Sequence, residues 1–114
     1  MKRDDTVYLQ HILDAIAKAQ TYLIDVDEAS FLVKSIVQDG VIRQIEIIGE
    51  ATKRLSIDVR SQNALVPWED IAGMRDKLIH DYFGVDLDMV WLTAINDLPK
   101  LQEEVIGILR QISE

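Results

Sequence analysis

Cysteine is absent from the 114-residue chain, which excludes disulfide bonds and thiolate metal sites. Long apolar runs are also missing, since no stretch approaches the roughly 20 apolar residues that a membrane-spanning helix needs. The N-terminus does not resemble a signal peptide, because Met1-Lys2-Arg3 is followed at once by Asp4 and Asp5. We therefore expect a cytoplasmic protein that does not enter a membrane.

Basic residues are scarce as well. The chain has 12 Lys and Arg against 20 Asp and Glu, which gives a net charge of −8. Nonspecific nucleic-acid binding depends on phosphate neutralisation by Lys and Arg, so a general coat for DNA or RNA is not expected. Phosphate chemistry would have to be confined to a local site, and a basic protein partner would suit the rest of the surface.

The hydrophobic pattern is helical, because apolar residues recur at steps of three and four rather than in alternation. A first helix is predicted from Asp4 or Asp5, either of which can cap it, to about Ile24. A second helical region is predicted over 28–55, with a bend or division at Gly40. Residues 58–66 are polar and are predicted to form a loop. The predicted buried stripes are Leu9, Ile12, Ile16, Ala19 and Leu23, then Val41, Ile45, Ile48, Thr52 and Leu55.

Two further helices complete the predicted fold. Pro67 is placed in the first turn of a third helix that ends at Gly84. Asp86 is predicted to cap a last helix that runs to about Ile112 and is kinked at Pro99. Residues 1–114 are accordingly expected to form a single all-α domain, an antiparallel bundle of four or five helices.

Arg75 interrupts the apolar pattern of the third helix. On ideal geometry it lies at the centre of a stripe made by Trp68, Ile71, Leu78 and Tyr82. A buried guanidinium needs an anionic partner. Either Glu46 or Glu50 could be that partner within the chain, or the position could admit a phosphate.

The surrounding residues form a longer motif. Residues 75–82 read RDKLIHDY, which is Arg, four residues, His, any residue, Tyr. Together with IIGEA at 47–51 and PWEDIAGM at 67–74, this segment resembles the HepT-like ribonuclease toxins of the HEPN superfamily. The resemblance extends over nearly the whole chain.

The resemblance implies a metal-independent RNA endonuclease without a cofactor, acting as a homodimer whose two motifs face each other. Arg75 and His80 would be the catalytic residues, with Asp76 as a supporting polar group that orients one of them. Cleavage needs both a base and an acid, and imidazole can serve either role near neutral pH. Two His80 side chains, one from each subunit, could supply both.

The resemblance also implies a partner. HepT-like toxins are typically paired with a small nucleotidyltransferase antitoxin of the MNT type, which silences the toxin by transferring AMP to the motif tyrosine, here Tyr82. Read from position alone, Tyr82 is equally a core residue with its hydroxyl at the edge. His80 could likewise only stabilise the carbonyl groups at a helix C-terminus.

Other candidate residues have simpler structural explanations. His80, Asp81, Asp86 and Asp88 superficially resemble metal ligands, but Asp86 and Asp88 suit the N-terminus of the last helix, and no metal site is predicted. His11 flanks the first buried stripe and is expected at the surface. Gly49 and Gly73 are expected to permit close helix contact.

Three hypotheses follow from these observations. The first is an RNase toxin inhibited by a nucleotidyltransferase. The second is a non-catalytic helical subunit that presents a nucleotide or substrate to that nucleotidyltransferase, which the acidic surface favours. The third is a structural bundle with an ion-paired Arg75. The complete motif favours the first.

Overall fold

The computed structural model describes residues 3–78 and 84–113, and every regular element in these ranges is helical. The prediction of an all-α fold is therefore confirmed. The elements in chain order are α1 (Arg3–Tyr22), α2 (Glu28–Phe31), α3 (Ser35–Lys53), α4 (Ile57–Gln62), α5 (Trp68–Ala72), α6 (Met74–Leu78), α7 (Leu87–Leu92), the π-helix η1 (Thr93–Asp97) and α8 (Leu98–Ser113).

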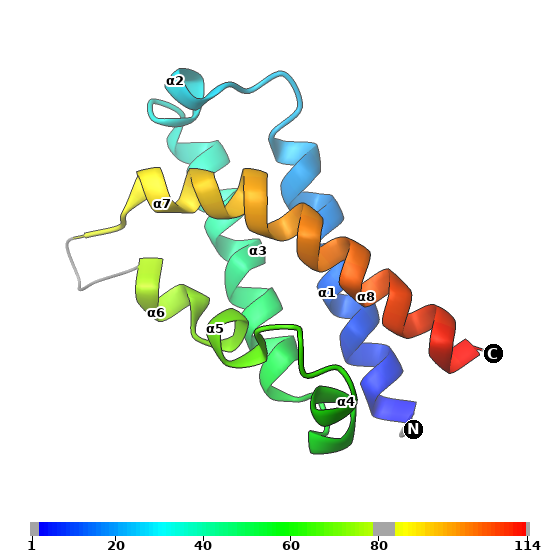
Figure 1. The fold of residues 1–114 in the computed structure, drawn as a ribbon. Helices are drawn as coiled ribbons and strands as arrows, with labels where there is room; N and C mark the ends of the chain where they lie inside the picture. Colours follow the sequence, from blue (N-terminus) through cyan, green and yellow to red (C-terminus); the bar gives the residue numbers. More distant parts are fainter. Residues whose placement is uncertain (1–2, 79–83, 114) are drawn as a thin grey trace.

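The three long helices α1, α3 and α8 form the body of the molecule (Figure 1). α3 runs back alongside α1, and α8 also packs on α1, so that the first and last described residues lie at the same end. The short helices α5 and α6 pack against α3. The molecule is elongated, with principal dimensions of 44 × 30 × 20 Å. None of the helices described is both long and apolar enough to cross a membrane.

The core follows the predicted stripes closely. Leu9, Ile12, Ile16 and Ala19 of α1 are fully buried, whereas Leu23 lies just beyond the helix and is partly buried. All five predicted residues of the second stripe, from Val41 to Leu55, are buried. The regular steps of three and four are what put these side chains on one face. The buried residues of η1 and α8 are Thr93, Ala94, Leu98, Leu101, Val105 and Ile108.

The second helical region divides at a different place from the one predicted. The break falls between α2 and α3, at residues 32–34, and Gly40 lies inside α3. A Cβ atom at Gly40 would lie 2.9 Å from Cε2 of Tyr22. Glycine therefore leaves room here for a ring from α1, and α3 continues through this residue.

The predicted loop at 58–66 contains a short helix, α4, whose N-terminus is fixed by two side chains. Ser56 Oγ accepts a hydrogen bond from Val59 N at 3.2 Å. Asp5 in turn accepts hydrogen bonds from both Ser56 N and Ser56 Oγ, each at 2.7 Å. Asp5, predicted as a possible cap of its own helix, is 2% exposed and instead ties α1 to α4.

The predicted third helix is divided at Gly73 into α5 and α6. Pro67 precedes the first helical residue, Trp68, rather than occupying the first turn. The predicted helix end at Gly84 follows residues 79–83, which lie outside the described residues.

The last helical region starts as predicted. Asp86 Oδ1 accepts a hydrogen bond from Met89 N at 3.1 Å. Just before Pro99, where a kink was predicted, the structure has the π-helix η1, in which Leu98 N donates to Thr93 O. A proline ring clashes with the carbonyl group four residues earlier in a regular α-helix, and a wider π turn relieves that crowding.

Candidate functional site

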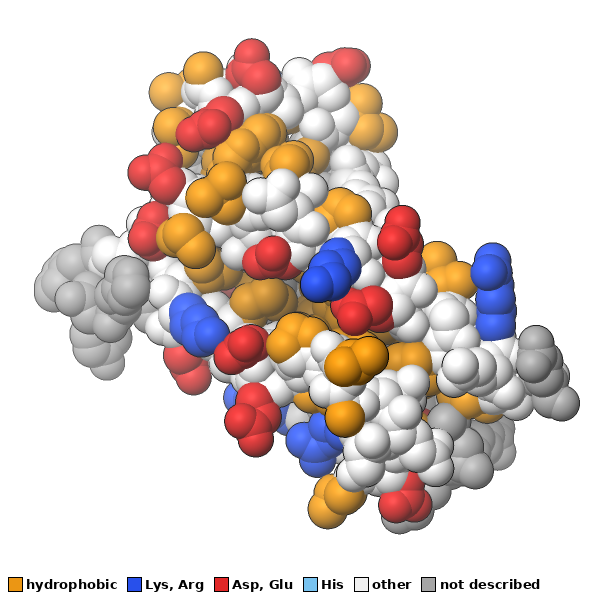
Figure 2. All heavy atoms as spheres, viewed as in Figure 1, with side chains coloured by type: hydrophobic (Ala, Val, Ile, Leu, Met, Phe, Trp, Pro, Cys, Tyr) orange, Lys and Arg blue, Asp and Glu red, His pale blue; other side chains and the backbone are white. Residues whose placement is uncertain are grey.

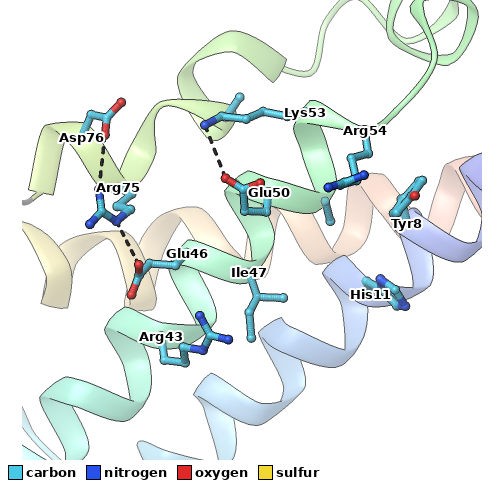
Figure 3. Close-up of a pocket in the computed structure, with 13 residues that line it drawn as sticks. Tyr8, His11, Arg43, Glu46, Ile47, Glu50, Lys53, Arg54, Arg75 and Asp76 are labelled. Carbon is cyan, nitrogen blue, oxygen red and sulfur yellow. Dashed lines mark hydrogen bonds and ion pairs between the residues drawn. The ribbon is translucent and has the colours of Figure 1, made fainter.

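A groove of about 580 Å³ runs over the exposed face of α3. α3 forms its floor, with Tyr8 and His11 of α1 on one side and Arg75 and Asp76 of α6 on the other (Figure 3). The complete lining is Tyr8, His11, Arg43, Glu46, Ile47, Gly49, Glu50, Ala51, Lys53, Arg54, Ala72, Arg75 and Asp76. Four helices, α1, α3, α5 and α6, therefore contribute to one surface.

The floor follows from the amphipathic pattern of α3. Its core residues recur at helical spacing, and the polar residues between them recur at the same spacing on another face. Arg43, Glu46, Glu50 and Lys53 are those groove-facing polar residues. Gly49 lies at the contact with α5, where an added Cβ would be 3.2 Å from the carbonyl oxygen of Ala72. The prediction that Gly49 permits close helix contact is thus confirmed.

Arg75 does not lie in a buried apolar stripe, so that prediction is wrong. Its side chain is 52% exposed and faces the groove. The break at Gly73 changes the helical register, and as a result Met74 and Leu78 are the buried residues of α6. The ideal geometry used for a continuous helix over 67–84 therefore does not apply at Arg75.

Arg75 forms an ion pair with one of its two predicted partners. Its Nε lies 2.9 Å from Oε2 of Glu46, in a hydrogen bond between α6 and α3. Glu50, the other candidate, lies 3.6 Å from the ammonium group of Lys53. Asp76 Oδ1 is 3.7 Å from Arg75 Nη1, so Asp76 and Glu46 both restrict where the guanidinium points (Figure 3).

The groove is locally more basic than the molecule. Four of its lining side chains are basic (Arg43, Lys53, Arg54, Arg75) and three are acidic (Glu46, Glu50, Asp76), whereas the whole chain carries −8. Within the described ranges, neither Arg43 nor Arg54 forms an ion pair. Exposed pairs such as Arg75–Glu46 are weak in water. An incoming phosphate can therefore replace Glu46 at little cost.

Figure 2, drawn with α8 in front of α3, shows acidic and basic side chains scattered over the opposite face. Figure 3 views the groove with α3 in front of α8. Since the whole chain is acidic and the groove has more basic than acidic side chains, a polyanion would bind there more favourably than elsewhere.

Two of the four predicted site residues, His80 and Tyr82, lie outside the described residues. The structure places the other two, Arg75 and Asp76, together at the wall of the groove. No group of three or more His, Cys, Asp or Glu side chains that could hold a metal ion occurs among the residues described.

Sequence reasoning missed the contribution of α1. His11 is exposed, as expected, but it also lines the groove. Its ring meets that of Tyr8 edge to face, with centroids 5.9 Å apart and an interplanar angle of 80°. Two aromatic residues three apart, beside the buried stripe rather than within it, were the signal that could have indicated this surface.

The fold and the groove define a class of protein, a small helical domain whose cationic groove can receive a phosphate. The comparison with known families narrows this class. The chain belongs to the ribonuclease HepT-like family, whose model matches residues 12–108. The resemblance to this family that was noted in the RDKLIHDY segment is thereby confirmed.

Three relatives illustrate the family. A Thermococcus cleftensis protein named "Probable ribonuclease HepT" is 41% identical over 102 residues, which cover 90% of this chain and 93% of the relative. A Methanocaldococcus jannaschii protein named "Putative RNase" is 38% identical over 113 residues, 99% of this chain and 97% of the relative.

A second protein of that organism, named "Gamma-glutamylcyclotransferase and putative RNase", is 43% identical over 114 residues. The match covers this whole chain but only 51% of that longer protein. No solved structure shows significant similarity to the chain.

Proposed function

We propose that this protein is a metal-independent RNA endonuclease, the toxin of a toxin–antitoxin pair, with one domain over residues 1–114. The observation that carries the proposal is the position of Arg75. It projects into a groove that offers further cations on α3, and it is followed five residues later by His80. Family membership and the ribonuclease names of the relatives support the same activity.

The proposed reaction is transesterification within RNA. A base takes the proton from the 2′-hydroxyl, whose oxygen attacks the adjacent phosphorus. The bond from phosphorus to the 5′-oxygen breaks, and an acid protonates that leaving oxygen. A 2′,3′-cyclic phosphate and a 5′-hydroxyl are the products. Two imidazoles can perform both proton transfers, and His80 from each of two subunits would supply them. This is the chemical reason for proposing a homodimer.

Arg75 would stabilise the negative charge that develops on the phosphate oxygens, since its planar guanidinium can donate two parallel hydrogen bonds. In the resting protein these donors face Glu46 and Asp76. Asp76 is a positioning residue in this account, because its carboxylate restricts the guanidinium and need not touch RNA.

Regulation by modification of Tyr82 is part of the proposal. A nucleotidyltransferase of the MNT type would transfer AMP from ATP to the phenol oxygen of Tyr82, with release of pyrophosphate. The AMP would add bulk and negative charge two residues from His80. Both effects oppose entry of an RNA phosphate. The toxin and its antitoxin would act in the cytoplasm.

The activity is tested by expression of the chain alone. Wild type should arrest growth, and His80→Ala should relieve the arrest while the purified variant keeps its helical circular dichroism. Equal harmlessness of wild type and variant, at equal soluble levels, would reject the RNase toxin. Light scattering tests the dimer, and a strict monomer at micromolar concentration would remove the two-histidine mechanism.

The modification is tested separately. Incubation with ATP and the partner nucleotidyltransferase should raise the intact mass by whole AMP groups. Tyr82→Phe should abolish that gain. A mass increase that survives the substitution would assign the modification to another residue.

The ion pair between Arg75 and Glu46 favours a second function. If Arg75 stays bound to Glu46, the domain would be a non-catalytic subunit that holds a nucleotide for the nucleotidyltransferase. Calorimetric titration with ATP separates the two readings. Tight ATP binding without RNA cleavage would favour this alternative.

A further inference from the structure

The side of the groove formed by α1 carries an aromatic pair that the proposed reaction does not use. Tyr8 and His11 lie three residues apart on α1, and their rings are held edge to face at 5.9 Å. The core-facing positions of this helix are taken by Leu9 and Ile12, both fully buried. His11 is exposed and Tyr8 is only partly buried, so the pair presents ring surface to the groove.

A cation accompanies the two rings. Arg54 follows the last residue of α3, is exposed, and lines the same groove. In Figure 3 Arg54, Tyr8 and His11 gather on the side of the groove away from Arg75 and Asp76. Among the described residues Arg54 has no carboxylate partner, whereas Arg75 is paired with Glu46. One end of the groove is therefore occupied by an internal ion pair, and the other end offers an unmatched charge.

From this arrangement we infer that Tyr8, His11 and Arg54 form a second nucleotide-binding subsite. It binds a nucleotide of single-stranded RNA next to the one cleaved beside Arg75. This inference rests on the proposed nuclease function. The base stacks on the aromatic pair, and Arg54 contacts the neighbouring phosphate. Ring surface combined with a free cation is the usual means of holding an unpaired strand.

A purely structural role does not account for the pair. Tyr8 packs against the core with part of its ring, but His11 is exposed, and its ring meets that of Tyr8 at the edge of the groove. The segment matched by the family model starts at residue 12, so both rings precede it. The case for the subsite therefore rests on the geometry of the groove and not on the family match.

Binding to a non-cleavable RNA tests the inference. The probe is a fluorescently labelled single-stranded oligonucleotide with 2′-fluoro groups in place of its 2′-hydroxyls, and the readout is anisotropy with the full chain. His11→Ala should weaken binding at least about fivefold, since one stacked base contributes a factor of that size or more. His11→Phe, which keeps a ring, should bind within about twofold of wild type.

The cation is tested by salt dependence with a matched control. Arg54→Ala should reduce the slope of log Kd against log salt concentration by roughly 0.7, the value for one phosphate contact on a single strand. Lys18→Ala removes the same charge from the exposed surface of α1 outside the groove. It should leave the slope unchanged. All variants alter exposed side chains, and thermal melting verifies that they fold.

The outcomes separate the subsite from the nuclease. If wild type cleaves ordinary RNA while His11→Ala binds the probe as tightly as wild type, the subsite is refuted and the nuclease stands. If His11→Phe is as weak as His11→Ala, stacking is refuted. If Lys18→Ala matches Arg54→Ala, the specific phosphate contact is refuted. If wild type binds but does not cleave, the nuclease fails while the subsite stands on its variants, and absence of RNA binding refutes both.

Discussion

The two faces of α3 are built on the same helix but respond to different constraints. One face carries Val41, Ile45, Ile48 and Thr52 into the core between the long helices. The other carries charged side chains into a groove shared with α1 and α6. Close packing determines the first face, and the second depends on which other elements happen to border it. Substitutions on the two faces should therefore affect different properties, stability on one and RNA chemistry on the other.

The largest effect on stability is expected at Ile48. Ile48 is fully buried, whereas its neighbour Ile47 is partly buried and lines the groove. Ile48→Ala should lower the free energy of unfolding by about 3 kcal/mol, since it leaves a cavity in the core. Ile47→Ala should cost about 1 kcal/mol, because that side chain is already partly hydrated. Urea denaturation, monitored by circular dichroism, measures the free energy of unfolding of both variants. Equal losses of stability would contradict the distinction between the two faces.

Loss of the Asp5 carboxylate should have the next largest effect. Asp5→Ala removes the acceptor of two hydrogen bonds from Ser56 and should cost about 2 kcal/mol. Asp4→Ala is the control, because Asp4 is exposed one position away. It should change stability by no more than about 0.5 kcal/mol. If the two variants unfold at the same urea concentration, the link between α1 and α4 is not important for stability.

Gly49 and Gly107 sharpen the comparison in a third way. Both lie in helices, where alanine is favoured over glycine by about 1 kcal/mol. Nothing lies within 4 Å of a Cβ placed at Gly107, so Gly107→Ala should gain up to that amount. At Gly49 the new atom would press on the carbonyl of Ala72, and we expect Gly49→Ala to be destabilising by about 1 kcal/mol. Thermal melting measures both changes in stability. A more stable Gly49→Ala variant would show that α5 can shift to make room for the added methyl group.

The smallest effect is a pH dependence at the start of α2. A hydrogen bond from Ser30 N to Asp27 Oδ1, 2.8 Å long, lowers the pKa of Asp27 below its ordinary value. A lowered pKa in the folded state stabilises the protein above the unfolded-state pKa of about 3.9, and this contribution disappears as the pH falls through the folded-state value. The stability difference between wild type and Asp27→Ala should therefore shrink as the pH is lowered from about 6 to about 3, a range that includes the unfolded-state pKa of about 3.9. A difference that is constant over this range would contradict the role of the cap.

Much of the fold could be predicted from residue spacing, because a buried face repeats with the period of the helix. The stripes from Leu9 to Ala19 and from Val41 to Leu55 are the examples. The helix breaks could not be predicted in the same way. Gly40 and Gly73 look alike in the sequence, yet Gly40 accommodates the ring of Tyr22 inside a helix, and Gly73 ends α5. Only the neighbouring elements distinguish these two glycines.

The candidate site was also partly predictable, from its motif and from its charges. The motif identified Arg75 and Asp76, and charge considerations gave Glu46 or Glu50 as the partner of Arg75, of which the structure shows Glu46. The exposure of Arg75 was not predicted, because it depends on the change of register at Gly73. Tyr8 and His11 were missed as groove residues because they lie more than 60 positions from the motif in the sequence, and only the packing of α1 against α3 brings them to the same groove.

The most direct test of the account is the rate at which purified protein cleaves a single-stranded RNA, compared between wild type and Arg75→Ala. We predict a loss of about 100-fold or more in kcat/KM, the size expected when a donor to a developing negative charge is removed. The melting temperature should stay close to that of wild type, since the Arg75 side chain is half exposed. Equal cleavage by the two proteins would contradict the assignment of this groove as the site where RNA is cut.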